Sequence, residues 1–137
     1  MVGECLHYAV SNAEMVRFEG LLGDEYFDVL DAWRKKMQHE EPVIGKETTR
    51  AYIQPPDRFT IEDLGWNRRI FVSTKGSRSA ILWNPWQERA LLLDQFQEDS
   101  WKNMVCLETA RFGDDILWLA PGETNIMELN IAAEKIP

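Results

Sequence analysis

The sequence predicts an all-β protein with the architecture of an antiparallel β-sandwich. Short runs rich in β-branched and aromatic residues recur along the chain, and turn signals separate them at intervals of roughly ten residues. The clearest of these signals are Pro55-Pro56-Asp57, Gly65-Trp66-Asn67 and Lys75-Gly76-Ser77. A chain of 137 residues with 45% hydrophobic residues is long enough to build its own core. We therefore expect a single domain over residues 1–137.

The first part of the chain predicts two strands and one ambiguous segment. Residues 4–10 alternate as in a strand buried on both faces, and residues 15–21 form a second strand pattern. From Asp24 to Gln38 the apolar residues fall at helical spacing, and Asp24 could cap such a helix. Because a short apolar run does not fix the period by itself, helix and strand both stay open for this segment.

The remaining elements follow from the same patterns. Residues 87–95 suit two helical turns, and Pro121-Gly122 is a type II turn signal. Further strands are expected at residues 50–53, 58–61, 69–74, 79–83, 104–110, 114–119 and 128–131.

The strand predicted from Met104 to Ala110 is apolar except for one acid. Side chains alternate across a strand, so Glu108 shares a face with Met104, Cys106 and Ala110. Burial without a partner raises the pKa of a carboxyl group, which is the condition that a general acid or base needs near neutral pH. Glu108 is therefore a candidate catalytic residue; the alternative is an acid that faces solvent or pairs with an arginine.

The composition argues against several classes of partner. The net charge of −8 would repel nucleic acid and anionic membrane surfaces. No window approaches the roughly 20 apolar residues that a transmembrane helix requires, and the first residues lack the pattern of a signal peptide. We expect a cytoplasmic protein that binds neither nucleic acid nor membrane.

Two cysteines and two histidines raise the question of a metal site. Cys5 and His7 are neighbours, but His39 and Cys106 are far apart in the sequence, and this is not the ligand spacing of a structural zinc site. In a cytosolic protein the two cysteines are more often reduced and packed as small apolar side chains. We expect no metal.

Three blocks of the chain resemble the glucose-6-phosphate 1-epimerase group of the aldose 1-epimerase (mutarotase) superfamily. These blocks are Lys75-Gly76-Ser77-Arg78-Ser79, Trp83-Asn84-Pro85-Trp86-Gln87-Glu88-Arg89-Ala90 and Trp101-Lys102-Asn103-Met104-Val105-Cys106-Leu107-Glu108. Upstream, Leu6-His7-Tyr8 resembles the strand that carries the family's catalytic histidine. The resemblance covers nearly the whole chain.

The resemblance implies a galactose mutarotase-like sandwich of which this chain matches roughly the C-terminal half. It also implies a strand end and loop, rather than a helix, between Asp24 and Gln38. Half of a sandwich leaves strand edges and apolar faces uncovered, and these attract partners. We therefore expect a homodimer, or a partner chain that covers the exposed sheet.

By the same resemblance, Glu108 corresponds to the general base and His7 to the general acid of an enzyme that interconverts α and β anomers. The substrate would be a hexose or hexose 6-phosphate, and no cofactor is required. Histidine suits this role because both of its protonation states are accessible near neutral pH. Without the resemblance, His7 would more often be a structural residue hydrogen-bonded to backbone.

Arg50, Asn84 and Trp86 are candidate substrate-binding residues, each with a structural alternative. Arg50 could contact the sugar or orient a neighbouring loop, and the indole of Trp86 could stack on a sugar or fill the core. Thr49 and Gln95 stand where the family has acidic residues. These departures favour an alternative function, a non-catalytic carbohydrate-binding or interaction module that keeps the fold without turnover.

Overall fold

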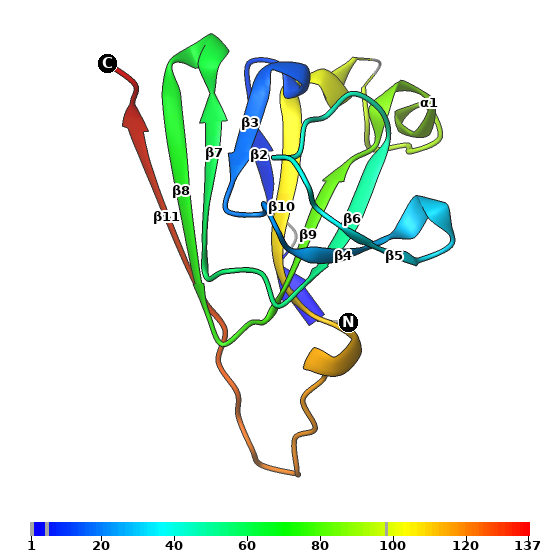
Figure 1. Cartoon of the computed structure of the whole chain (residues 1–137), viewed down its shortest axis with the longest axis vertical. Helices are drawn as coiled ribbons and strands as arrows, with labels where there is room; N and C mark the ends of the chain where they lie inside the picture. Colours follow the sequence, from blue (N-terminus) through cyan, green and yellow to red (C-terminus); the bar gives the residue numbers. More distant parts are fainter. Residues whose placement is uncertain (1, 5, 98) are drawn as a thin grey trace.

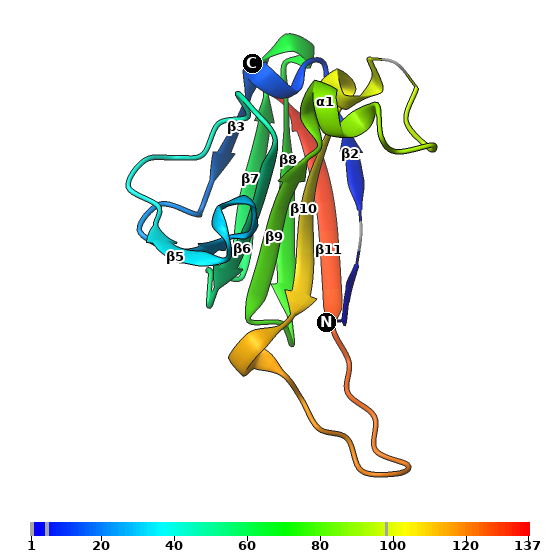
Figure 2. The same cartoon turned by 90° about the vertical axis from the view of Figure 1, so that its right-hand side faces the viewer.

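The computed structural model describes residues 2–4, 6–97 and 99–137, and these residues form two β-sheets packed face to face (Figures 1 and 2). Every strand pairing among them is antiparallel. The predicted all-β antiparallel sandwich is therefore confirmed.

The larger sheet has seven strands, which are β1 (Val2–Glu4), β2 (His7–Ala9), β4 (Glu25–Asp28), β5 (Arg34–Met37), β6 (Thr48–Ile53), β9 (Ser79–Asn84) and β10 (Met104–Arg111). Their order is β1-β10-β9-β6-β4-β5. The short strands β1 and β2 pair with successive parts of β10, opposite its edge with β9. As predicted, β10 is buried on both faces except near Glu108 and Arg111.

The smaller sheet has the order β11-β8-β7-β3. Its strands are β3 (Val16–Glu19), β7 (Arg58–Asp63), β8 (Arg68–Lys75) and β11 (Glu128–Lys135). The turn after β8 carries the chain to β9 of the larger sheet. At Gly76 the backbone φ is +81° and a Cβ atom would collide with the carbonyl oxygen of Ile126, so this turn requires glycine.

The main core lies between the two sheets. Its buried members include Tyr52, Leu82 and Val105 of the larger sheet and Ile61 and Val72 of the smaller one. Since the side chains of a strand alternate, the other face of the larger sheet points away from this core. We call it the outer face.

The helices are short. They comprise the α-helix α1 (Trp86–Ala90) and the 3-10 helices η1 (Ala13–Met15), η2 (Val29–Asp31), η3 (Leu64–Trp66), η4 (Ser100–Asn103) and η5 (Gly113–Asp115). α1 and the turns after it occupy the segment in which two helical turns were expected.

Two expectations need correction, and one open alternative is decided. Residues 4–10 are not one strand buried on both faces, because β2 is a short edge strand that leaves His7 and Ala9 exposed. For residues 24–38, where helix and strand were both open and the resemblance implied a strand end and loop, β4 and β5 form a hairpin. Residues 116–119 form no strand; η5 precedes them, anchored by the ion pair of Arg111 with Asp115 (3.0 Å).

Candidate functional site

The outer face brings side chains from four strands into one row. His7 of β2 lies opposite Cys106 of β10, which lies opposite Trp83 of β9, which in turn lies opposite Thr49 of β6. Side chains of directly opposed residues lie on the same face of a sheet. The row therefore runs across the outer face, away from the main core.

Glu108 stands beside this row. It follows Cys106 by two residues on β10, so its side chain also points to the outer face. His7 and Glu108 are diagonal neighbours on adjacent strands, a relation that places their Cα atoms about 7–8 Å apart. The register thus brings together the two residues that the sequence predicted as base and acid.

The surroundings of Glu108 are mixed. The side chain is half-buried, and Ile81 and Ala110 beside it belong to a smaller apolar cluster on this face. The thiol of Cys106 donates a hydrogen bond to Glu108 Oε1 (3.1 Å) and also lies 3.1 Å from the carbonyl oxygen of Leu6. Glu108 is held near β2 while part of its carboxylate stays accessible.

The imidazole of His7 packs against two aromatic rings. Its centroid lies 5.6 Å from that of Trp83 and 6.4 Å from that of Phe96, and the latter two rings meet edge to face at 5.9 Å. Such contacts restrict the orientation of a ring on an exposed surface. His7 is exposed on this face of the sheet.

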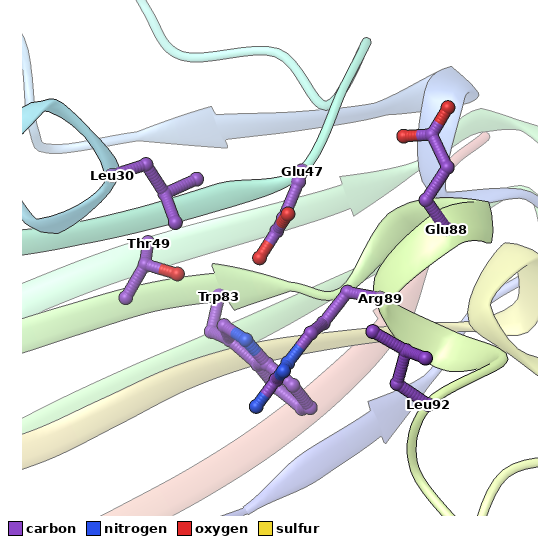
Figure 3. A pocket seen from close by; sticks show the side chains of 7 residues that line it. All are labelled: Leu30, Glu47, Thr49, Trp83, Glu88, Arg89 and Leu92. Carbon is purple, nitrogen blue, oxygen red and sulfur yellow. The ribbon is translucent and has the colours of Figure 1, made fainter.

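Beyond Trp83 the outer face is hollowed into an open pocket of about 510 Å³ (Figure 3). Its lining comes from the η2 loop, the start of β6, the end of β9, and α1 with the turn after it: Leu30, Glu47, Thr49, Trp83, Glu88, Arg89 and Leu92. A volume of this size suits a small organic molecule. Because Trp83 also contacts His7, the pocket adjoins the part of the face that carries His7 and Glu108.

Two charged side chains reach into this pocket from opposite walls. In Figure 3 the carboxylate of Glu47 points toward Thr49 and Trp83, and Arg89 extends from α1 across the pocket, whereas Glu88 points away. Within the described part of the chain, neither Glu47 nor Arg89 forms an ion pair or a side-chain hydrogen bond. Both groups are available to a ligand.

Of the three residues expected to bind substrate, Asn84 and Trp86 lie outside the pocket lining, and Arg50 lines an adjoining hollow that shares Leu30, Glu47 and Thr49 with the pocket. Arg50 is on the inner face of β6, where Nη1 donates to Gln38 Oε1 (2.9 Å) and the guanidinium lies 5.1 Å from the ring centroid of Tyr26. Asn84 is fully buried, and Trp86 packs against Trp101 with centroids 4.4 Å apart. The structure does not bring these three side chains to Glu108 and His7.

The sequence patterns did not indicate Glu47, Trp83, Phe96 or Arg89 as site residues. The strand alternation that places Thr49 on the outer face would also have indicated Glu47, two residues earlier. No comparable signal exists for Phe96 or Arg89, because their positions depend on how α1 and the following turns fold onto the sheet.

No group of three or more His, Cys, Asp or Glu side chains among the described residues could hold a metal ion. Cys5, part of the sequence-level metal question, lies outside the described residues. No described helix has the length and apolar character needed to cross a membrane.

Comparison with known proteins gives consistent matches. The family model described as aldose 1-epimerase matches residues 8–131, a range that contains Glu108 and begins one residue after His7. A curated Cenchrus ciliaris protein named "Putative glucose-6-phosphate 1-epimerase" is 30% identical over 118 residues, which are 85% of this chain and 36% of that protein. An Escherichia coli K12 protein of the same name is 30% identical over 105 residues, or 76% of this chain and 35% of that protein.

A solved structure shares the fold. The "putative mutarotase (YeaD)" of Salmonella typhimurium superposes with a TM-score of 0.75 over 78% of this chain and 36% of that one, at 24% identity. The chain therefore has a mutarotase-like fold. It matches about a third of the length of these curated relatives.

Proposed function

Since the chain belongs to the aldose 1-epimerase family, we propose that it interconverts the α and β anomers of a hexose or hexose 6-phosphate, with Glu108 as general base and His7 as general acid. One observation carries this proposal. The two side chains lie on adjacent strands of one accessible face, beside a pocket large enough for a sugar.

The chemistry needs one group of each kind. Glu108, as carboxylate, takes the proton from the hydroxyl on C1 while His7, as imidazolium, gives a proton to the ring oxygen. The C1–ring oxygen bond breaks, the open-chain aldehyde turns about its C1–C2 bond, and ring closure on the other face returns both protons. Each residue then regains its starting form, so the cycle consumes no co-reactant.

The geometry supports a base and an acid on separate strands. C1 and the ring oxygen of a pyranose are bonded to each other, so a base and an acid must flank one small region of the sugar. Diagonal positions on paired strands are close enough for Glu108 and His7 to flank such a region, and this supports the proposal. The aromatic contacts of His7 limit the orientations that its ring must sample before proton transfer.

Anomer exchange measured by NMR tests the proposal. We expect the chain to accelerate exchange of glucose 6-phosphate, glucose or galactose over buffer, and Glu108→Gln to reduce that acceleration by roughly 10²–10⁴-fold, the usual contribution of a general acid or base. Asp114→Asn, at an exposed acid outside the site, is the control and leaves the rate unchanged. No acceleration by the wild type, or equal rates for wild type and Glu108→Gln, rejects the catalytic proposal.

The short match favours a second candidate, a carbohydrate-binding or interaction module without turnover. The chain corresponds to about a third of the curated relatives, so a catalytic pocket completed by other segments of those proteins would be incomplete here. Trp83 lines the pocket, and its fluorescence would report a bound sugar. A sugar-dependent fluorescence change without anomer exchange identifies this second function.

A further inference from the structure

The open pocket on the outer face holds a hydrogen-bonding pair that the acid–base mechanism does not use. Glu47 precedes β6 and shares the outer-face alternation with Thr49, while Arg89 reaches in from α1 on the opposite wall (Figure 3). Trp83 lies between this pair and His7. The two charged groups are therefore in the part of the site away from the reacting carbon.

Among the described residues, the carboxylate of Glu47 has no protein partner in the pocket. Its side chain is half-buried in the pocket wall, and no hydrogen-bond donor among the described side chains satisfies its carboxylate. Neither of its oxygens is fully buried, so both can meet a ligand that enters from solvent. A ligand hydroxyl group would supply the missing donor.

Arg89 complements Glu47. A guanidinium only donates hydrogen bonds and a carboxylate only accepts them, whereas a sugar hydroxyl does both. Two neighbouring hydroxyl groups can therefore donate to Glu47 and accept from Arg89 at the same time. The indole of Trp83 and the side chains of Leu30 and Leu92 give the same pocket apolar surface for the C–H groups of the ring.

We propose that Glu47 and Arg89 are specificity-determining residues that bind neighbouring hydroxyl groups of an uncharged hexose, at the end away from its C1. This inference rests on the proposed function, because it takes the sugar to lie with C1 at Glu108 and His7. It also narrows that function, since the first proposal admits both free and phosphorylated hexoses.

The charges of the pocket favour a free hexose over a hexose phosphate. A phosphate near neutral pH bears a charge of about −1.5 to −2 and has acceptor oxygens, so it is usually bound by more than one cationic group. The lining of this pocket holds one guanidinium, and the carboxylate of Glu47 points into the pocket. A phosphate bound beside Arg89 would also lie beside Glu47, which repels it.

Binding constants measured by NMR titration test the inference without requiring turnover. The ligands are glucose, galactose and their 6-phosphates, and the proteins are the wild type, Glu47→Gln, Arg89→Met and the control Glu14→Gln. We expect Glu47→Gln and Arg89→Met each to raise the Kd of the free sugar about tenfold, the loss of one charged hydrogen bond. Glu14→Gln removes the same charge from an exposed acid of η1 that lies outside the pocket lining, so its Kd stays near the wild-type value.

The phosphorylated sugars give the second arm. We expect the wild type to bind the 6-phosphates with a higher Kd than the free sugars. Glu47→Gln should reduce this difference in Kd, because the carboxylate that repels the phosphate is gone. The inference is overturned if the wild type prefers the 6-phosphates or binds no sugar, or if Glu47→Gln and Glu14→Gln have equal effects. Far-UV circular dichroism of each variant checks that it is folded.

The two proposals fail separately. If the wild type binds free sugars through Glu47 and Arg89 but anomer exchange is absent, the pocket inference stands and the catalytic proposal falls. If exchange is accelerated but KM and Kd are the same in wild type and Glu47→Gln, the catalytic proposal stands and the pocket inference falls.

Discussion

The side-chain amide of Asn84 is fully buried, and both its nitrogen and its oxygen form hydrogen bonds. Nδ2 donates to the carbonyl oxygens of Trp101 and Met104 (2.9 Å each), and Oδ1 accepts from the backbone N–H of Trp86 (2.8 Å). These bonds tie the end of β9 to the start of β10 and to the first residue of α1. Asn84 therefore serves the fold at a place from which it positions both walls of the site.

Replacing Asn84 tests this role. Asn84→Ala leaves buried backbone groups without partners, so we expect the free energy of unfolding to fall by about 2–4 kcal/mol. Asn130→Ala, at an exposed asparagine of β11, is the control and changes stability little. Urea denaturation measures both. If the stability of Asn84→Ala equals that of the wild type while sugar binding is lost, Asn84 is a ligand contact and the structural role is wrong.

Asp24 is a second residue whose contribution to folding stability can be measured. Oδ2 of this half-buried side chain is buried without a hydrogen-bond partner, and burial, followed by the nearby charge of Glu41, raises the pKa of Asp24 above its ordinary value of 3.8. The folded chain thus binds the proton more tightly than the unfolded chain. Its contribution to stability is present below pH 3.8 and is lost as the pH rises through the raised folded value.

Asp24→Asn removes the loss of stability that ionisation of Asp24 causes. We expect the variant to have a higher Tm than the wild type at about pH 7, and the difference to shrink toward about pH 3, where Asp24 is protonated in both states. Thermal melts across this range give the comparison. Asp57→Asn, at an exposed acid, shows no such gain. A Tm of Asp24→Asn at or below that of the wild type at neutral pH contradicts the prediction.

At the scale of the element, the hairpin of β4 and β5 shows a conflict between local pattern and fold. Its apolar residues have a helical spacing, yet β4 pairs with both β5 and β6 in the larger sheet. Ala32 and Trp33 have φ values of 50° and 58° between η2 and β5. This left-handed conformation disfavours residues that carry a Cβ atom.

Ala32 therefore offers a stabilising change. Ala32→Gly relieves the left-handed conformation, and after the added entropy of glycine in the unfolded chain we expect the free energy of unfolding to rise by about 0.5–1 kcal/mol. Ala133→Gly is the matched control, since Ala133 is an exposed residue of β11. The added entropy of glycine should lower the free energy of unfolding of this variant by about 0.5–1 kcal/mol. Equal losses for both variants, measured by urea denaturation, would refute strain at Ala32.

Several elements were predicted within two residues because pattern and turn signals agree there. β7, β8, β9 and β10 are bounded by turn signals or loops and read as strands on their own. The family was predicted correctly from blocks that surround these strands. Residues 24–38 and 114–119 were harder, since pairing partners far along the chain, and not the local pattern, decide whether a segment becomes a strand.

The candidate site was predictable only in part. Alternation along β10 and a family resemblance indicated Glu108 and His7, and their roles stay predictions. Their mutual placement depends on the register of β2 against β10, which joins residues about a hundred positions apart and leaves no local trace. The same holds for Glu47 and Arg89, whose pocket exists only once β6, β9 and α1 are packed.

At the scale of the whole molecule, one segment stands apart from the sandwich. In both views residues 116–127 extend from the end of the molecule opposite α1 (Figures 1 and 2). Ile116, Trp118, Leu119 and Ile126 of this arm are more than half exposed, with Trp118 at 89%. Exposed apolar clusters of this kind mark surfaces that bind other proteins.

We therefore expect the chain to self-associate through this arm. Burying one indole and its apolar neighbours removes nonpolar surface from water. At about 25 cal/mol per Å² of buried nonpolar area, this contributes several kcal/mol to association. Trp118→Ser should shift the population toward monomer, because it removes the most exposed of these side chains.

Trp66→Ser is the control for that experiment, because Trp66 is a half-exposed indole of η3, in the connection between β7 and β8 and outside the arm. Sedimentation velocity at low micromolar concentration distinguishes the species. A dimer in the wild type and in Trp66→Ser, with weaker association in Trp118→Ser, places the interface on the arm. A compact monomer in all three proteins rules out self-association at this concentration, and a dimer that survives Trp118→Ser unchanged moves the interface to another surface, such as the open edge of β11.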